Sequence, residues 1–233
     1  MKSAWSSGQR TPWQACVFCC AFFVTLCLLG RVARGSELKG LDARKANEDY
    51  AEKMMLYGRL VGDWQVEYSA WDANGKQVVK TNGEWHWGWV LDGRAIQDVW
   101  IMPGREERQK PGAPKGEWGT TLRYYDPKID AWHIVFVGPA YNNLNVFVAH
   151  QRGDEIVQEG TSSSGKPTRW IFSDISRQSF RWRDEVSDDG GKTWTLREEM
   201  HARRQSQENA SYPARRYRKG DRDRDRSHMA RLR

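Results

Sequence analysis

Residues 83–91 carry three tryptophans, Trp85, Trp87 and Trp89, at every second position. Side chains at this spacing lie on one face of a β-strand. An indole ring buries a large apolar area and offers one N–H donor, so such a row suits a packed core or the wall of a ligand pocket. The sequence holds 13 Trp in 233 residues, and this high number indicates an unusually aromatic interior.

Two carboxylates fall among these aromatic side chains. Asp98 shares a predicted strand face with Trp100, and Asp184 shares one with Trp182. Burial raises the pKa of a carboxyl group, which is how proteins prepare a general acid or base. The alternative is an ordinary ion pair with an arginine such as Arg123. We favour the ion pair, so binding is expected rather than catalysis.

Among the five histidines, His150 has the strongest claim to an inward position, because it shares a strand face with Val146 and Val148. We predict that His150 and Arg123 orient a ligand. No pair of histidines has the spacing of helical metal ligands, and no Gly-x-Ser-x-Gly nucleophile motif occurs. The sequence therefore predicts neither a metal site nor a serine nucleophile.

From Trp64 onward the apolar residues recur with a period of two. Turn residues such as Asp92-Gly93 separate ten short segments, which indicates an antiparallel meander. Closure into a barrel removes the exposed strand edges. The predicted fold is thus an all-β, up-and-down barrel of about ten strands, with a β-sandwich as the alternative. The predicted strands are 64–71, 83–91, 94–102, 119–126, 131–138, 144–152, 155–160, 167–174, 179–187 and 193–203.

One short amphipathic helix is predicted before the barrel, within residues 42–58. Tyr50, Met54 and Tyr57 recur at helical spacing, and Gly58 supplies a stop. This helix is expected to pack against the barrel or to cap it.

The N-terminal segment has the composition of a targeting sequence. Residues 15–30 form an almost entirely apolar run that follows basic residues and precedes Ala33-Arg34-Gly35. This layout is typical of a secretory signal peptide, and the run is short for a membrane-spanning helix. We predict a signal peptide at 1–35 and a secreted or periplasmic protein; an uncleaved membrane anchor is the alternative. All four cysteines lie in this segment, so no disulfide is expected in the mature protein.

The net charge of +7 comes from the ends of the chain. Residues 36–204, the predicted barrel domain, contain 24 basic and 26 acidic side chains. This near balance argues against a nucleic-acid-binding face. Residues 205–233 include the run GDRDRDR and are predicted to form a disordered basic tail. No membrane association is expected after signal cleavage.

Gly62-Asp63-Trp64 resembles the Gly-x-Trp motif of lipocalin-like, or calycin, barrels. Further motifs are WVLDGRAI, TLRYYDP with Trp132 after it, FRWR, DDGGKTW and a closing Arg-Arg pair. Together they resemble, over residues 45–204, a bacterial family of uncharacterised lipocalin-like domains that is similar in fold to nitrobindin. The resemblance implies that Trp64 closes the barrel floor beside Arg197 or Arg203. It implies a fold and transfers no established activity.

The likeness to nitrobindin also raises haem as a possible cofactor. Nitrobindin-like barrels hold haem through one histidine within apolar walls. His201 on the last predicted strand is the candidate by position, and His150 is the alternative. We otherwise expect no cofactor.

Residues 187–194, SDDGGKTW, resemble the Asp-box motif of sialidases. Asp189 is suited to accept backbone N–H groups in a turn, and Gly191 to adopt a positive φ. The motif therefore predicts a stabilised hairpin rather than a reactive site.

The predicted function is the binding of a small hydrophobic or aromatic molecule in a tryptophan-lined cavity. The alternatives are an acid–base isomerase, cyclase or lyase acting on such a molecule, a haem-binding protein, and a solid barrel that meets a protein partner. The predicted ligand-binding residues are Trp85, Trp87, Trp89, Trp100, Arg123, Tyr125, Trp132, His150, Trp170 and Trp182.

Overall fold

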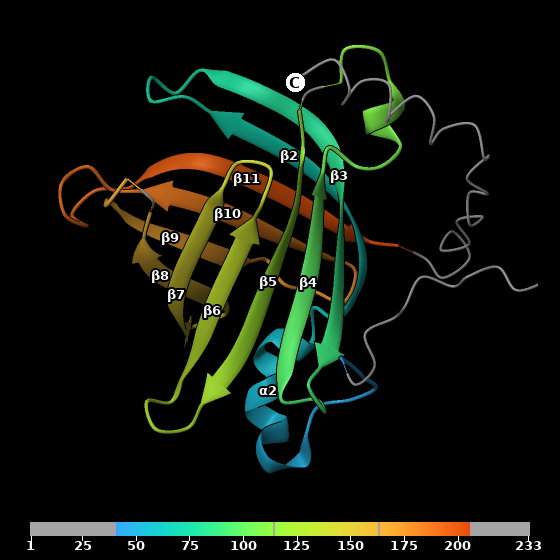
Figure 1. Ribbon diagram of the computed structural model, residues 1–233. Helices are drawn as coiled ribbons and strands as arrows, with labels where there is room; N and C mark the ends of the chain where they lie inside the picture. Colours follow the sequence, from blue (N-terminus) through green and yellow to red (C-terminus); the bar gives the residue numbers. More distant parts are fainter. Residues whose placement is uncertain (1–40, 114, 163, 206–233) are drawn as a thin grey trace, which may run out of the picture. The chain divides into compact units, whose positions relative to one another are not determined.

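Ten consecutive antiparallel strands, β2 to β11, close into a barrel (Figure 1). The computed structural model describes residues 41–113, 115–162 and 164–205. Each strand pairs with the next along the chain; β11 pairs with β2, and the pairing of β3 with β4 completes the ring. The predicted all-β barrel is confirmed. The predicted signal peptide and basic tail lie outside the described residues, except for Gln205.

The barrel strands are β2 (Gly62–Trp71), β3 (Gln77–Val90), β4 (Ala95–Met102), β5 (Glu117–Asp126), β6 (Ala131–Gly138), β7 (Asn143–Arg152), β8 (Glu155–Thr161), β9 (Pro167–Ser173), β10 (Ser179–Val186) and β11 (Thr195–Arg204). The helices are η1 (Glu48–Tyr50), α2 (Ala51–Gly58) and η2 (Glu107–Gln109). A further short strand, β1 (Asp42–Ala43), pairs with the end of β3.

Alternation of apolar and polar residues places one face of β2 inside the barrel. Trp64, Val66 and Tyr68 are buried, whereas Gln65 and Glu67 are exposed. The same period of two is what keeps a half-buried antiparallel strand in register, because a shift by one residue would expose the apolar set. The inward residues of the ten strands form one aromatic core cluster.

Two predicted boundaries were wrong. Residues 42–58 form a short strand, a 3-10 turn and the eight-residue helix α2, instead of one continuous helix. The side chain of Asn47 accepts the backbone N–H of Asp49 and caps the turn, so the helical segment begins late. Strand β3 begins at Gln77, because residues 77–82 continue the pairing with β2 although few of them are apolar.

The end of the barrel beside α2 is closed by Trp64 and Arg204. The Trp64 indole N–H donates to the carbonyl of Leu60 at 2.8 Å. The Arg204 guanidinium lies 4.0 Å from the Trp64 ring centroid and donates to the carbonyls of Val61 at 2.8 Å and Arg177 at 2.7 Å. The arginine that stacks on Trp64 is therefore Arg204, and the expectation of Arg197 or Arg203 was wrong by position.

The predicted Asp-box hairpin is confirmed as a turn between β10 and β11. Asp189 Oδ1 accepts the backbone N–H groups of Lys192 at 3.0 Å and Thr193 at 2.8 Å, and the Ser187 hydroxyl at 2.8 Å. Hydrogen bonds from Thr193 and Ser187 lower the pKa of Asp189 to about 2. The carboxylate is fully used in holding the turn.

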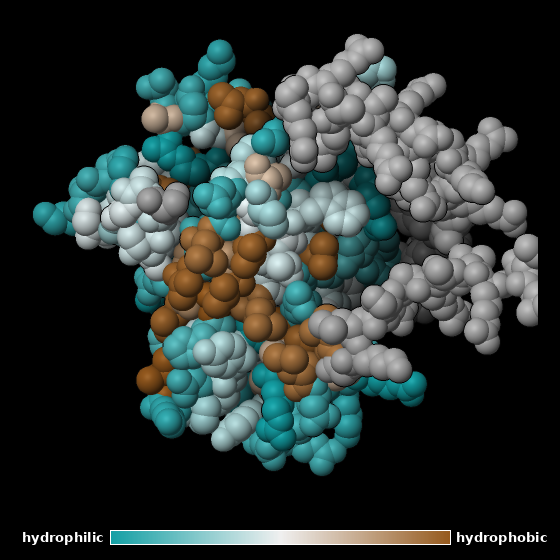
Figure 2. Space-filling view, in the orientation of Figure 1, coloured by the Kyte–Doolittle hydropathy of each residue, from teal (hydrophilic) through white to brown (hydrophobic). Residues whose placement is uncertain are grey.

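The outer surface is apolar over β4 to β7. Figure 2 shows apolar side chains gathered on this face, and they include Val99, Val137, Leu144, Val146 and Val148, which are all exposed. The outer positions of β2, β10 and β11 instead hold charged residues such as Glu67, Arg181 and Glu199.

Candidate ligand-binding cavity

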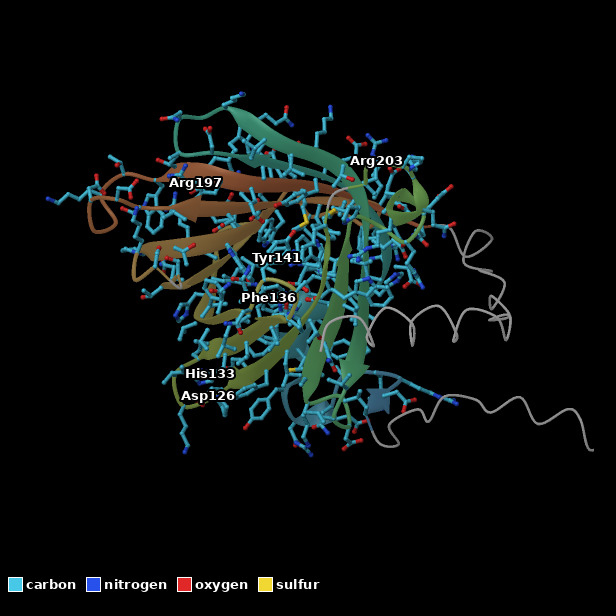
Figure 3. The ribbon with its side chains drawn as sticks, turned by 45° about the horizontal axis from the view of Figure 1, so that its top comes forward. Asp126, His133, Phe136, Tyr141, Arg197 and Arg203 are labelled. Carbon is cyan, nitrogen blue, oxygen red and sulfur yellow. The ribbon has the colours of Figure 1, made fainter. Side chains whose placement is uncertain are left out.

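The half of the barrel far from α2 is hollow. It encloses a cavity of about 750 Å³ that opens at the end where the β4–β5, β6–β7 and β8–β9 connections meet. Its wall includes Phe136, and Tyr141 lies at the opening; both are near the centre of the view in Figure 3, away from Asp126 and His133 at the other end of the strands. Besides Tyr141, the aromatic side chains that line the cavity are Tyr68, Trp85, Trp100, Phe136, Trp170 and Trp182.

The aromatic wall is packed edge to face. The ring centroids of Trp170 and Trp182 are 5.4 Å apart, with the ring planes at 66°. Those of Tyr68 and Trp100 are 5.9 Å apart at 68°. The Trp100 indole N–H also contacts the Met200 sulfur at 3.2 Å. These contacts hold the rings in fixed orientations, so the cavity is formed before any ligand enters.

The half of the barrel beside α2 is solid. Arg123 forms an ion pair with Asp98, and both side chains are almost fully buried. The Arg123 guanidinium lies 4.2 Å from the Trp87 ring centroid and 5.4 Å from that of Tyr57. The Tyr57 hydroxyl accepts from Gln158 at 3.0 Å, and burial raises the pKa of Tyr57. The favoured ion pair of Asp98 is confirmed, and it lies below the cavity floor.

The predicted ligand-binding residues divide between these two halves. Four of them line the cavity: Trp85, Trp100, Trp170 and Trp182. Three are buried in the solid half: Trp87, Arg123 and Trp132. Trp89 and Tyr125 are partly buried near α2, where Trp89 meets Gly58 and Tyr125 packs on Tyr50.

The inward placement of His150 was wrong. His150 is exposed, together with Val146 and Val148, and the inward residues of β7 are Phe147 and Ala149. Both faces of β7 carry apolar residues, so alternation gave no basis for choosing the phase. His150 therefore cannot orient a molecule inside the barrel.

The positions of the histidines also bear on the predicted alternative of a haem-binding protein. His201 is exposed on the outer face of β11, where it lies 3.3 Å from Glu199. None of the four histidines in the described residues lines the cavity. The side chains that do line it hold no imidazole to act as the axial ligand, so they do not fit a haem held in the manner of nitrobindin.

The sequence predicted Asp184 as a buried acid but missed its neighbour Glu198, and the ion pair favoured for Asp184 was wrong, because no salt bridge to it exists among the described residues. Asp184 on β10 and Glu198 on β11 are directly opposite each other in the strand register, and both line the cavity. The Thr168 hydroxyl donates to Asp184 at 2.9 Å. Glu198 lies at the same strand phase as the apolar, buried Met200, so the period of two in this strand contained the signal for it.

Burial changes the acidity of this pair. Desolvation raises the pKa of Asp184 to about 6, opposed by the hydrogen bond from Thr168. Desolvation, and then the nearby charge of Asp184, raise the pKa of Glu198 to about 7. Burial also raises the pKa of Tyr68, which neighbours Glu198. Both carboxyl groups therefore gain or lose their protons near neutral pH.

The remaining charged groups of the cavity lie at its opening. Lys115 is exposed there, with its ammonium nitrogen 5.3 Å from the Tyr141 ring centroid. Glu117 is occupied by the β6–β7 turn, since it accepts the backbone N–H groups of Ala140 at 3.0 Å and Tyr141 at 3.2 Å. Asp184 and Glu198 are thus the acids that remain open to a guest.

The described residues contain neither a candidate metal centre nor a candidate transmembrane helix. No cluster of three or more histidine, cysteine, aspartate or glutamate side chains there is arranged to hold a metal ion. No helix in that part of the chain has the length and apolar content needed to cross a membrane. Comparison of the chain with protein-family models and with curated proteins returned no match.

Proposed function

We propose that this protein binds a small, largely apolar or aromatic molecule in the hollow half of its barrel. The observation that carries the proposal is the cavity of about 750 Å³, walled by aromatic rings and open at one end. Ligand sites are concave, mostly apolar and contain a few placed polar groups. Here the placed polar groups are Asp184 and Glu198. The resemblance to lipocalin-like barrels, with Arg204 stacked on Trp64, supports the same reading.

The proposal is tested with the neutral fluorescent probe N-phenyl-1-naphthylamine and the full chain. We expect its emission to rise on binding and to saturate at one site per chain. Asn145→Phe fills the cavity wall, whereas Val146→Phe adds the same ring to the outer apolar face. We expect Asn145→Phe to weaken binding at least about 10-fold, or about 1.4 kcal/mol, and Val146→Phe to leave it unchanged.

Binding that responds to Val146→Phe and not to Asn145→Phe would place the probe on the outside of the barrel. Absence of any bound probe in the wild-type chain would leave the cavity without a demonstrated guest. Either result contradicts the proposed function.

Acid–base catalysis on such a molecule is a second candidate, favoured by one observation. Asp184 and Glu198 have pKa values of about 6 and about 7, the range in which one carboxyl donates a proton while another accepts one at neutral pH. Asp98, the other carboxylate that the sequence offered as an acid or base, is paired with Arg123 in the solid half and is not a candidate for this role. Recovery of every bound molecule unchanged after incubation would argue for binding alone.

We also propose that residues 1–35 are removed as a signal peptide and that the barrel works outside the cytoplasm. The apolar run of residues 15–30 and the small residues after it support this. Mass spectrometry of the protein purified from cells tests it: a new N-terminus near Ser36 is expected, and an intact N-terminus in membrane fractions would indicate an anchor.

A further inference from the structure

Asp184 and Glu198 stand side by side on the cavity wall without a salt-bridge partner among the described residues; desolvation dominates the pKa of Asp184, and the charge of Arg197 lowers it only as a minor effect. Residues that are directly opposite on antiparallel strands have Cβ atoms about 4.5–5.5 Å apart. Among the described residues no basic side chain forms an ion pair with either carboxylate. Arg197, the nearest cation on β11, instead donates to the carbonyl of Asp72 at 2.8 Å and lies 3.9 Å from Asp188. It stands toward the β10–β11 hairpin, away from the centre of the barrel (Figure 3).

Two like charges opposite each other on a sheet are destabilising. Most other ionised carboxylates of the barrel have partners: Glu199 pairs with Arg181, Glu185 with Arg169, and Glu84 with Arg105. A cation that enters the cavity would relieve the repulsion between Asp184 and Glu198. A metal ion would need a third protein ligand, and no such group of three exists in the described residues.

The walls around the pair suit an organic cation. Trp170 is the strand neighbour of Asp184 on β9, and Trp182 precedes Asp184 by two positions on β10. Tyr68 neighbours Glu198 from β2. An ammonium group over aromatic faces gains a cation–π attraction, which is larger where water is excluded. Acids and aromatic rings therefore converge on the same part of the cavity.

A further polar group of the wall is unsatisfied. The indole N–H of Trp85 is buried and has no hydrogen-bond partner among the described residues. Trp85 lines the cavity on β3. An unpaired buried donor costs free energy, so a ligand with an acceptor atom or a bridging water would stabilise it. The rest of the wall offers mainly apolar surface.

We propose that the ligand of this cavity is an amine: an aromatic or apolar body that carries one ammonium group held between Asp184 and Glu198. This inference rests on the proposed function, since it assigns the chemical class of the ligand at the same site. It also accounts for the two adjacent acids, which an apolar ligand alone would leave without an ionic partner.

Three probes of one shape test the proposal: 2-naphthylmethylamine, 2-naphthylmethanol and 2-naphthoate. Their affinities for the full chain are measured by calorimetry at pH 8. We expect the ammonium probe to bind at least about 10-fold more tightly than the alcohol, and the carboxylate to bind most weakly. Asp184→Asn/Glu198→Gln is expected to abolish the preference while retaining the alcohol. Glu67→Gln, a matched change on the outer face, is expected to keep it.

The outcomes separate the two proposals. If the alcohol binds as well as the amine, or the carboxylate binds best, the amine proposal is overturned and the cavity still binds an apolar guest. If none of the three probes binds, the proposed function fails and the amine proposal fails with it. The wild-type comparison needs no variant, so a variant that does not fold cannot obscure the result.

The pH dependence gives an independent readout. The affinity for the ammonium probe is expected to fall about 10-fold or more between pH 8 and pH 5, as Asp184 and Glu198 take up protons, while that of the alcohol stays constant. Lys115→Met measures the contribution of the ammonium group at the opening. An amine affinity that does not change with pH would contradict the proposal. The other titratable side chains of the cavity wall are Tyr68, Lys115, Glu117 and Tyr141, and the charges of Glu185 and Arg197 also act on Asp184.

Discussion

The two halves of this barrel differ in their buried charged side chains. Arg123 and Asp98 neutralise each other in the solid half, whereas Asp184 and Glu198 face the hollow half without a basic partner among the described residues. The first pair is a structural ion pair, and the second is exposed to whatever enters. The same residue types thus have opposite roles, decided by what stands opposite them on the neighbouring strand.

Removal of Arg123 should be strongly destabilising. Arg123→Met leaves Asp98 charged and unpaired inside the barrel, and such losses are about 3–5 kcal/mol. Arg152→Met breaks the exposed pair with Glu159 and should cost less than about 1 kcal/mol. Urea unfolding of the full chain measures both, and Asp98→Asn/Arg123→Met should recover part of the loss. Equal effects of the two single variants would show that the buried pair has no special role.

The acid pair in the cavity should make stability depend on pH. The folded-state pKa values of about 6 and about 7 exceed the value of about 4 for unfolded carboxyl groups. Between pH 4 and pH 7 the folded chain therefore holds protons that the unfolded chain has released, so the free energy of unfolding falls as the pH rises. One pKa unit corresponds to about 1.4 kcal/mol, so a shift of about two units corresponds to about 3 kcal/mol for an isolated carboxyl; the interaction between the two groups and water in the open cavity reduce this to about 1 kcal/mol for each.

Asp184→Asn/Glu198→Gln should therefore be more stable than the wild type at pH 8, by about 2 kcal/mol, and equal to it at pH 4. Thermal unfolding at pH 4, 6 and 8 checks this, with Glu67→Gln as the control. A constant difference between variant and wild type at all three values would mean that the two carboxyl groups do not titrate abnormally.

The last strand closes the barrel floor through one side chain. Arg204 at the end of β11 stacks on Trp64 of β2 and donates to the carbonyls of Arg59, Val61 and Arg177. These carbonyls belong to chain segments that leave α2 and join β9 to β10. Arg204 thus connects three elements that are distant in sequence.

Arg204→Met should destabilise the full chain by about 2 kcal/mol, because charge-assisted hydrogen bonds to three carbonyls are lost. Arg203→Met, the matched change at the adjacent exposed position, should cost less than about 0.5 kcal/mol. Midpoints of urea unfolding compare the two. A larger effect at Arg203 would contradict the assignment of the stacking arginine.

The strands could be predicted because their alternation is strong where one face is polar. In β2 and β3 the inward set is unambiguous, and Trp85 was placed correctly. In β7 the predicted inward face was wrong. Apolar residues occupy both faces of this strand, so the sequence does not show whether the face of His150 or the face of Phe147 is inward. Glu198 shares the phase of Met200 and could have been found by the same rule.

The division of the barrel into a solid and a hollow half could not be predicted. Trp87 packs on Arg123 below the cavity, and Trp85, two residues earlier on the same face, lines it. Alternation gives the face of a residue but not its height along the barrel axis, which depends on strand tilt and stagger. How far α2, with its buried Tyr57, fills the interior depends on the packing of the whole molecule.

The central claim is that a small molecule occupies the hollow half. Four methionines of the described residues report on it: Met102 and Met200 line the cavity, whereas Met54 and Met55 lie in α2, the first buried and the second exposed. The full chain, labelled with ¹³C at the methionine methyl groups, is titrated with N-phenyl-1-naphthylamine and followed by NMR. We predict saturable shifts of the Met102 and Met200 signals with those of Met54 and Met55 unchanged. Shifts confined to Met55, or saturating binding that moves neither Met102 nor Met200, would contradict the account.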